Sequence, residues 1–242
     1  MSMGNEQELT HSKSDSWKMF NRISEKYDLL NRLLSLGLDI SWRKKLSAFV
    51  PAQTGLKILD IATGTADVLI TLVQSQPNIQ EGVGVDMAAK MLDIGRKKII
   101  RKGLENKLIL KTGDANQLPF PGQSFDCTTI AFGIRNVEKP ETVLREMHRV
   151  LRPKGRSLIL EFSLPENKVI RILHLFYLRT VVPFLGWLIS GQYKAYKYLN
   201  QTIEQFPYGQ SFCTLMEKAG YIRVKANPLL FGAATIYQGD KP

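Results

Sequence analysis

Hydrophobic and polar positions follow two alternating periods through the middle of the chain. Short apolar runs, typical of buried strands in a parallel sheet, alternate with stretches in which apolar residues recur at helical spacing. Strands are expected at residues 56–62, 82–87, 108–113, 125–132 and 156–163, and helices at residues 66–75, 88–103 and 139–151. This alternation predicts an α/β fold with a mostly parallel sheet and helices on both faces.

The N-terminal part of the chain divides into a polar segment and a helical one. Residues 1–15 are polar and are expected to form a disordered tail, and residues 16–242 a single domain. Residues 16–50 are expected to form N-terminal helices, because apolar and aromatic residues recur there at helical spacing. We expect the aromatic side chains of this segment to pack in the core: Trp17, Phe20 and Tyr27.

The C-terminal part departs from the regular alternation. Residues 165–208 are expected to form a helical cap or substrate insertion. The apolar segment 169–189 approaches the length of a membrane span, but Arg171 and Arg179 would be costly in hydrocarbon. A helix or helix pair that covers the sheet is favoured, and contact with lipid or with an apolar substrate stays open. After a helix at residues 209–219, two short strands predict a closing hairpin with an antiparallel last strand.

The end of the first predicted strand carries the strongest signal of a ligand site. The chain passes from an apolar strand through a small-residue turn at Gly64 into a helix, which is how α/β folds bind nucleotides. With a single glycine in the turn, an ordinary strand-to-helix turn is an equally good interpretation. Three acids favour the ligand site, because Asp60 lies in this strand and Asp86 and Asp114 end the next two. An acid about 20 residues after such a turn can bind ribose hydroxyls.

The composition narrows the class of partner and the compartment. The formal net charge of +11 favours an anionic partner, which could be a nucleic acid, a phospholipid surface or an anionic metabolite. The two cysteines, Cys127 and Cys213, form neither a disulfide framework nor a metal-binding spacing. A reducing, cytoplasmic compartment is the simple interpretation.

Several blocks of the sequence resemble the ubiquinone/menaquinone biosynthesis C-methyltransferases. The most specific is Phe-Gly-Ile-Arg-Asn at residues 132–136, since the turn and the acids are shared with many S-adenosylmethionine enzymes. The resemblance covers roughly residues 17–241. The other blocks lie at residues 27–31, 35–37 with Trp42, 59–65, 114–121 and 149–163.

The resemblance implies a Rossmann-like class I methyltransferase with a seven-stranded, mostly parallel sheet and an antiparallel last strand. It also implies S-adenosyl-L-methionine as methyl donor, no metal, and ring-carbon methylation of a reduced polyprenyl quinol in menaquinone or ubiquinone biosynthesis. The naphthoquinol demethylmenaquinol is slightly preferred over the benzoquinol. The positions expected to bind the cofactor are Asp60, Thr63, Gly64, Thr65, Asp86, Met87, Asp114, Ala115 and Ala131.

The cofactor turn departs from the family pattern. The family usually has Gly-Gly-Thr-Gly-Asp, whereas Thr63 and Ala66 replace two of these glycines here. If either position requires a positive φ, its side chain is strained.

The catalytic candidate is Arg135, which follows the fourth strand at the edge where α/β sheets bind ligands. Its guanidinium could stabilise the phenolate of the quinol, although a local salt bridge explains an arginine equally well. Asn136 and Tyr27 are further substrate candidates, and no histidine is an obvious base.

The basic charge and the apolar segment predict a peripheral protein at the inner face of an anionic membrane. A homodimer or a biosynthetic complex is compatible with the sequence, and nucleic acid is not expected as a partner. The alternatives are another small-molecule or lipid methyltransferase, an RNA methyltransferase, a nucleotide-dependent dehydrogenase and a non-catalytic membrane-surface protein. The Phe-Gly-Ile-Arg-Asn block argues against the first, the absence of an RNA-binding module against the second, and the lone turn glycine against the third.

Overall fold

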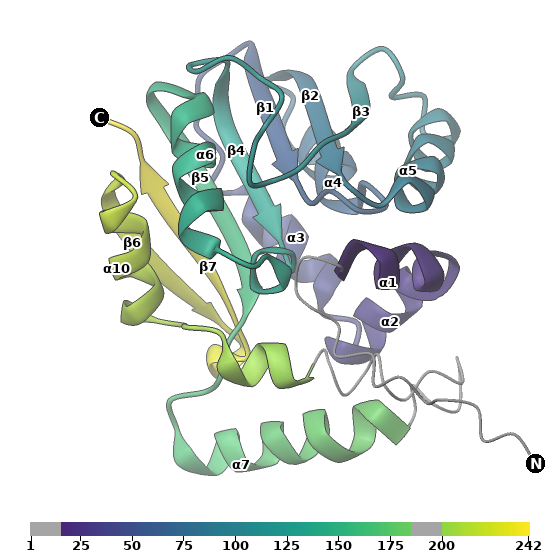
Figure 1. Ribbon diagram of the computed structural model, residues 1–242, viewed down its shortest axis with the longest axis vertical. Helices are drawn as coiled ribbons and strands as arrows, with labels where there is room; N and C mark the ends of the chain where they lie inside the picture. Colours follow the sequence, from purple (N-terminus) through teal and green to yellow (C-terminus); the bar gives the residue numbers. More distant parts are fainter. Residues whose placement is uncertain (1–15, 185–199) are drawn as a thin grey trace, which may run out of the picture.

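The computed structural model describes residues 16–184 and 200–242, apart from the side chains of Leu30, Leu33 and Leu34. The tail expected at residues 1–15 therefore lies outside the described residues. Within the described ranges, seven strands form a single sheet (Figure 1). They are β1 (Leu56–Ile61), β2 (Ile79–Asp86), β3 (Leu108–Thr112), β4 (Phe125–Ala131), β5 (Leu151–Phe162), β6 (Ile222–Leu229) and β7 (Ala234–Asp240).

The strand order in the sheet is β3-β2-β1-β4-β5-β7-β6. Strands β1 to β5 run parallel to one another, whereas β7 is antiparallel to both β5 and β6. The predicted mostly parallel sheet with an antiparallel last strand and a closing hairpin is confirmed. Because β1 lies in the middle, its end is flanked by the ends of β2 and β4, where α/β folds place their ligands.

Alternate residues of the central strand face two separate cores. Leu56 and Ile58 pack on one face against α3 (Asp39–Ser47), α4 (Asp67–Ser75) and α5 (Ala89–Arg101). Leu59 and Ile61 pack on the other face against α6 (Pro140–Val150) and α10 (Gln210–Lys218). All four side chains are almost completely buried. The continuous apolar run that predicted a buried parallel strand therefore reflects helices on both faces.

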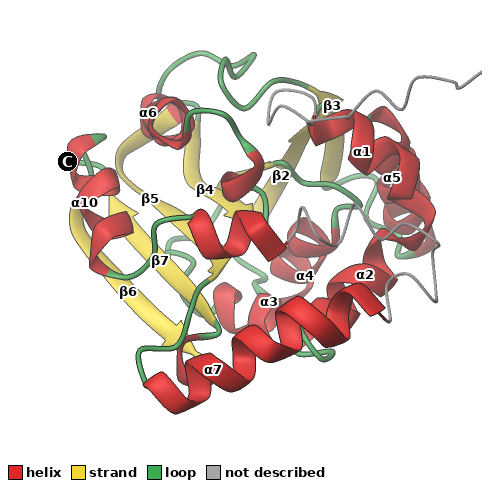
Figure 2. Ribbon diagram, turned by 60° about the horizontal axis from the view of Figure 1, so that its bottom comes forward, coloured by secondary structure: helices red, strands yellow, loops and turns green. Residues whose placement is uncertain are grey.

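Further helices lie beyond the carboxyl ends of the parallel strands (Figure 1). They are α1 (Ser16–Ile23), the short η2 (Ser24–Lys26), α2 (Tyr27–Leu34), and α7 (Lys168–Phe176) with the π-helical turn η4 (Tyr177–Val181). Figure 2 shows α7 across the front of this end, with α2 and α3 behind it. Residues 185–199 of the expected cap lie outside the described residues.

Strand β5 begins earlier than expected, at Leu151 instead of residue 156. The stretch that was expected only to end the preceding helix already pairs with β4, because Leu151 lies opposite Phe125. The register then shifts between Phe125 and Cys127, and Lys154 adopts a φ of 63°. An irregularity of this kind accommodates extra residues in one strand, which an apolar pattern alone does not reveal.

Candidate active site

The turn between β1 and α4 contains three residues in the left-handed region. Ala62, Gly64 and Ala66 have φ values of 50°, 56° and 64°. Of the two positions where the sequence departs from the family glycines, Ala66 therefore takes a conformation that favours glycine, whereas Thr63 does not. Ala66 is also the N-cap of α4 and offers no side-chain hydrogen bond to the helix.

Asp86 connects this turn to the end of β2. Its Oδ2 accepts a hydrogen bond from the Gly64 N–H at 2.8 Å, and its Oδ1 accepts one from the Ala88 N–H at 2.8 Å. Burial raises the pKa of Asp86, and the backbone N–H groups that bind the carboxylate oppose this rise. Each carboxylate oxygen has two acceptor sites, so Asp86 can bind the turn and ribose hydroxyls together.

A cavity of about 250 Å³ lies over this turn and the ends of β2 and β3. Most of the site residues expected from the sequence line this cavity. One of them is a second acid, Asp114, whose Oδ1 accepts hydrogen bonds from the backbone and the side chain of Asn116. Oδ2 of Asp114 has no such bond among the described residues and is available to an amino group. The expected cofactor and substrate residues that line the cavity are Gly64, Asp86, Met87, Asp114, Ala115, Tyr27 and Asn136.

The other expected cofactor residues line a second, smaller cavity on the far side of the turn. They are Asp60, Thr63, Thr65 and Ala131. The two cavities share three wall residues, Tyr27, Ala62 and Phe132. The structure therefore divides the expected cofactor positions between two adjoining spaces.

Arg135 lines neither cavity. Its side chain is 2% exposed and forms an ion pair with Glu161, with 2.5 Å between Nη1 and Oε1. Nη1 also donates to the Phe132 carbonyl oxygen at 2.7 Å. Burial raises the pKa of Glu161 although Arg135 opposes the rise. In this geometry the local salt bridge, the alternative weighed against a catalytic role, accounts for the contacts of Arg135.

Asn136 and Tyr27 do reach the larger cavity. Nδ2 of Asn136 donates to the Phe132 carbonyl oxygen at 3.3 Å, while its buried Oδ1 has no partner among the described residues. An unpaired buried acceptor at a cavity wall is suited to a ligand hydroxyl. Burial raises the pKa of the Tyr27 hydroxyl, and a hydrogen bond with Asn31 opposes the rise.

Comparison with known proteins identifies the family. Residues 7–241 match the ubiE/COQ5 methyltransferase family. The chain belongs to this family. It is 43% identical to the demethylmenaquinone methyltransferase of Thermus thermophilus, over 93% of this chain and 100% of the relative. It is 40% identical to the ubiquinone/menaquinone biosynthesis C-methyltransferase UbiE of Geobacter sulfurreducens, over 92% of this chain and 87% of the relative.

Solved structures with lower identity agree with the fold. A SAM-dependent methyltransferase from Thermotoga maritima matches 93% of this chain and 100% of its own, with a TM-score of 0.65 at 18% identity. A SAM-dependent methyltransferase from Aquifex aeolicus matches 96% of this chain and 100% of its own, with a TM-score of 0.56 at 16% identity. The class I methyltransferase fold expected from the sequence is confirmed.

The sequence pattern missed part of the methyltransferase cavity. Trp17 and Phe20 of α1 were expected in the core. Phe20 does pack against the core, but both residues also line the cavity, as does Glu138. Helical spacing of aromatic residues shows only that they share a face, and a cavity wall and a core give the same spacing. The expectation that Tyr27 packs in the core is likewise too simple, since its ring is half-buried at both cavities.

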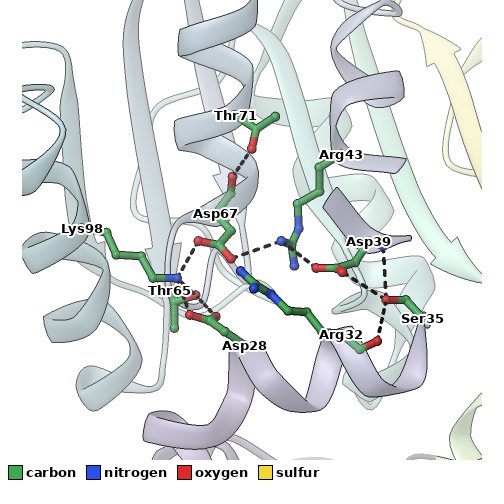
Figure 3. A network of polar contacts seen from close by, with 9 residues as sticks. All are labelled: Asp28, Arg32, Ser35, Asp39, Arg43, Thr65, Asp67, Thr71 and Lys98. Atoms are coloured by element: carbon green, nitrogen blue, oxygen red, sulfur yellow. Dashed lines mark hydrogen bonds and ion pairs between the residues drawn. The ribbon is translucent and has the colours of Figure 1, made fainter. Parts of the chain in front are cut away.

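The N-terminal helices of the methyltransferase are joined to the cofactor turn by an ionic network (Figure 3). Nζ of Lys98 lies 2.6 Å from Asp28 on α2 and 2.5 Å from Asp67 on α4. The Thr65 hydroxyl donates to Asp28 at 2.7 Å and accepts from Lys98 at 2.9 Å. This network positions α2, and with it Tyr27, over the turn.

Asp60 lies beneath the turn, in the centre of the sheet. Its carboxylate accepts hydrogen bonds from the hydroxyls of Thr63 at 2.6 Å and Thr129 at 2.5 Å, and its residue is 1% exposed. Burial raises its pKa to about 6, although both hydroxyls oppose the rise. The ordinary value for aspartate is 3.8, so the folded chain holds this proton more tightly than the unfolded chain.

Asp60 therefore makes folding dependent on pH in a defined direction. The stability that the protonated Asp60 carboxyl adds to the folded state is fully present below pH 3.8 and is lost as the pH rises through 6. Between these limits we expect the free energy of unfolding to fall by about 3 kcal/mol on this account. Asp60→Asn removes this dependence, so variant and wild type should diverge between pH 4 and 7 in urea unfolding. If the free energy of unfolding depends on pH in the same way for both proteins, burial does not raise the pKa of Asp60.

Proposed function

We propose that the protein transfers a methyl group from S-adenosyl-L-methionine to a ring carbon of a polyprenyl quinol in menaquinone or ubiquinone biosynthesis, with demethylmenaquinol as the preferred acceptor. The carrying observation is that one cavity joins two acids at the ends of adjacent strands, Asp86 and Asp114, to Tyr27 and Asn136 near the N-terminal helices. Membership of a methyltransferase family and the names of its quinone-biosynthesis relatives support this assignment.

The residues around the turn fit the methyl donor. Asp86 presents a carboxylate beside the turn, where ribose hydroxyls can donate to it, and Asp114 presents one to the adenine amino group. Gly64 lines the cavity, and a Cβ at this position would lie 3.2 Å from Cε of Met91, which is closer than an ordinary van der Waals contact. When bound, S-adenosylmethionine supplies an electrophilic methyl group on a sulfonium.

The acceptor side of the cavity can orient a flat ring. Trp17 and Phe20 offer aromatic surface, which suits stacking on a quinol. The unpaired Oδ1 of Asn136 can orient the quinol by accepting a hydrogen bond from a ring hydroxyl. The ring carbon becomes a good nucleophile when the neighbouring hydroxyl loses its proton, which passes to water. In this proposal Arg135 is a positioning residue, because it fixes the segment between β4 and α6 from which Asn136 projects. Alignment of donor and acceptor then supplies much of the acceleration.

Complementation tests the proposed reaction in cells. The chain is expressed in a bacterium whose own demethylmenaquinone methyltransferase gene is deleted, and the quinones are extracted and measured by mass spectrometry. Restored menaquinone with loss of demethylmenaquinone is the expected result. If only the ubiquinone branch is restored, the benzoquinol is the acceptor. If neither branch recovers while the protein is present at the wild-type level, the proposed acceptor class is wrong.

The proposed acceptor carries a long isoprenoid tail, so we further propose that the protein works at the cytoplasmic face of the membrane that holds it. No helix in residues 16–184 or 200–242 is long and apolar enough to cross a membrane. The outer face of α7 instead exposes large apolar side chains, each 60–67% exposed: Val169, Ile172, Leu173 and Phe176. The overall charge of +11 favours an anionic surface. A homodimer or a biosynthetic complex stays a prediction.

Loss of the apolar α7 face should release the protein from lipid. We expect Phe176→Glu to reduce binding to phosphatidylglycerol-containing vesicles by about tenfold, because burying one large apolar side chain contributes that order of free energy. Ile100→Glu is the matched control, since Ile100 is 64% exposed on α5 and its loss should leave vesicle binding unchanged. Sedimentation at low salt measures both. An equal loss for the two variants, or no binding by the wild type, contradicts the proposed surface.

A further inference from the structure

The turn between β6 and β7 places two large apolar residues in the left-handed region of the backbone. Leu230 and Phe231 have φ values of 42° and 54°, and they are 46% and 76% exposed. Hairpin turns ordinarily use glycine, asparagine or aspartate at such positions, because a larger side chain clashes with the backbone there. This turn therefore contains residues that suit its conformation poorly, and it leaves their side chains exposed.

The base of the turn is fixed, whereas its two apolar side chains are not. The Ser163 hydroxyl, just after β5, donates to the Gly232 carbonyl oxygen at 2.7 Å, and the Ser163 N–H donates to the Ala233 carbonyl oxygen at 3.0 Å. Leu230 and Phe231 pack in neither apolar core of the described residues. Backbone strain persists only where its surroundings fix it, and it often marks a functional site. Packing within the folded chain does not explain why these two residues stand here.

The turn lies beside the start of α7 (Figures 1 and 2). A Cβ on Gly232 would lie 3.3 Å from Cα of Pro165, in the loop that leads from β5 into α7. The turn therefore adjoins the helix that carries the apolar α7 face, which begins at Val169. Two elements that are far apart in the sequence thus expose large apolar side chains at one end of the molecule.

A lipid surface fits these exposed side chains. Leucine and phenylalanine suit the boundary between lipid headgroups and acyl chains, which needs no partner of matching shape. Lys168, the first residue of α7, is exposed near the turn, and Glu166 two residues earlier balances its charge. Attraction to an anionic surface then comes from the overall charge of +11.

We infer that the β6–β7 turn is a second membrane-inserting element, in which Phe231 enters the lipid from a strained position. This inference rests on the proposed membrane function and extends it to a part of the chain that is separate from α7. It has an unusual consequence for stability. A substitution that relieves the strain should stabilise the folded chain and at the same time weaken its binding to lipid.

Phe231→Gly tests both effects in one protein. Glycine adopts a positive φ without strain, so we expect Tm to rise by about 2–4 °C. Loss of the aromatic side chain should weaken binding to phosphatidylglycerol-containing vesicles about tenfold in sedimentation at low salt. Unchanged vesicle binding overturns the inference. If Tm does not rise, Phe231 carries no strain for lipid contact to explain, and the inference is wrong.

Gln123→Gly is the matched control. Gln123 is also exposed and has a φ of 57°, but it precedes β4 and lies at the amino end of the parallel strands. The β6–β7 turn lies at their carboxyl end, since Ala234 of β7 pairs with Phe162 of β5. Gln123→Gly should gain similar thermal stability and bind vesicles within about threefold of the wild type. If it loses binding as Phe231→Gly does, relief of strain explains the loss, and the inference is wrong.

Phe176→Glu in the same assay separates this inference from the membrane function on which it rests. If Phe176→Glu loses vesicle binding and Phe231→Gly keeps it, the apolar α7 face alone contacts lipid and the inference fails. If the wild type binds no vesicles, the proposed membrane function itself is wrong. Analytical ultracentrifugation tests the other occupant, a second copy of the chain. A wild-type dimer that Phe231→Gly dissociates, with unchanged vesicle binding, overturns the inference.

Discussion

Asp86→Asn is expected to weaken binding of S-adenosylhomocysteine by at least about 100-fold, because two charge-assisted hydrogen bonds to ribose hydroxyls each contribute about 1.5–3 kcal/mol. The substitution also disturbs the turn. The two carboxylate oxygens of Asp86 accept from different backbone N–H groups, those of Gly64 and Ala88. An asparagine side chain has one acceptor oxygen, so its amide N–H₂ would face one of these donors. Isothermal titration calorimetry measures the change in affinity.

A second acid on the neighbouring helix gives the matched control for Asp86. Asp93 on α5 is 63% exposed at its side chain and pairs with Arg96. Asp93→Asn should bind S-adenosylhomocysteine as the wild type does. An Asp86→Asn protein that keeps its thermal stability and binds within about threefold of the wild type would contradict the placement of the ribose at the end of β2.

Glu161→Gln is expected to lower the free energy of unfolding by about 3–5 kcal/mol, the usual effect of removing one partner from a buried ion pair. Arg135 would keep its charge in a site that is 2% exposed, without the carboxylate 2.5 Å away. The backbone is affected too, since Glu161 also accepts from the Phe162 N–H at 2.9 Å. Urea unfolding at neutral pH measures the loss.

The double variant Arg135→Met with Glu161→Gln separates an unpaired charge from lost packing. Removing both charges should restore stability to within about 2 kcal/mol of the wild type, because the desolvation cost of the pair disappears with its attraction. Arg135→Met alone should be as unstable as Glu161→Gln, and more so at high pH, where the buried Glu161 must ionise. If Arg135→Met keeps the stability of the wild type, the buried ion pair does not hold this segment in place, and the role of Arg135 as a positioning residue is wrong.

The sheet and the acidic edge could be predicted from the sequence for a definite physical reason. Parallel strands bring their carboxyl ends to one edge, so acids that end successive strands come together even when about 28 residues separate them. Asp86 and Asp114 follow this rule and line one cavity. The sequence also predicted strain at Ala66 if this position requires a positive φ. Ala66, which replaces a family glycine, does have a positive φ.

The remainder of the site depends on tertiary contacts that no local pattern encodes. Arg135 lies at the correct edge, but the direction of its side chain is set by Glu161, a residue on another strand. The sequence pattern did not single out Arg43, because only the fold buries this side chain against Asp39 and Asp67. The aromatic residues Trp17 and Phe20 have the spacing of core residues, and the position of α1 over the strand ends makes them part of the cavity wall.

The transfer of labelled methyl from S-adenosylmethionine to demethylmenaquinol tests the central claim most directly. The acceptor is offered in its chemically reduced form and, in a parallel reaction, in its oxidised form, and mass spectrometry locates the label on the ring. The account predicts label on a ring carbon of the reduced quinol alone, because only the quinol can form the nucleophilic phenolate. Label at equal rates in both forms, or none in either while S-adenosylhomocysteine binds normally, would contradict it.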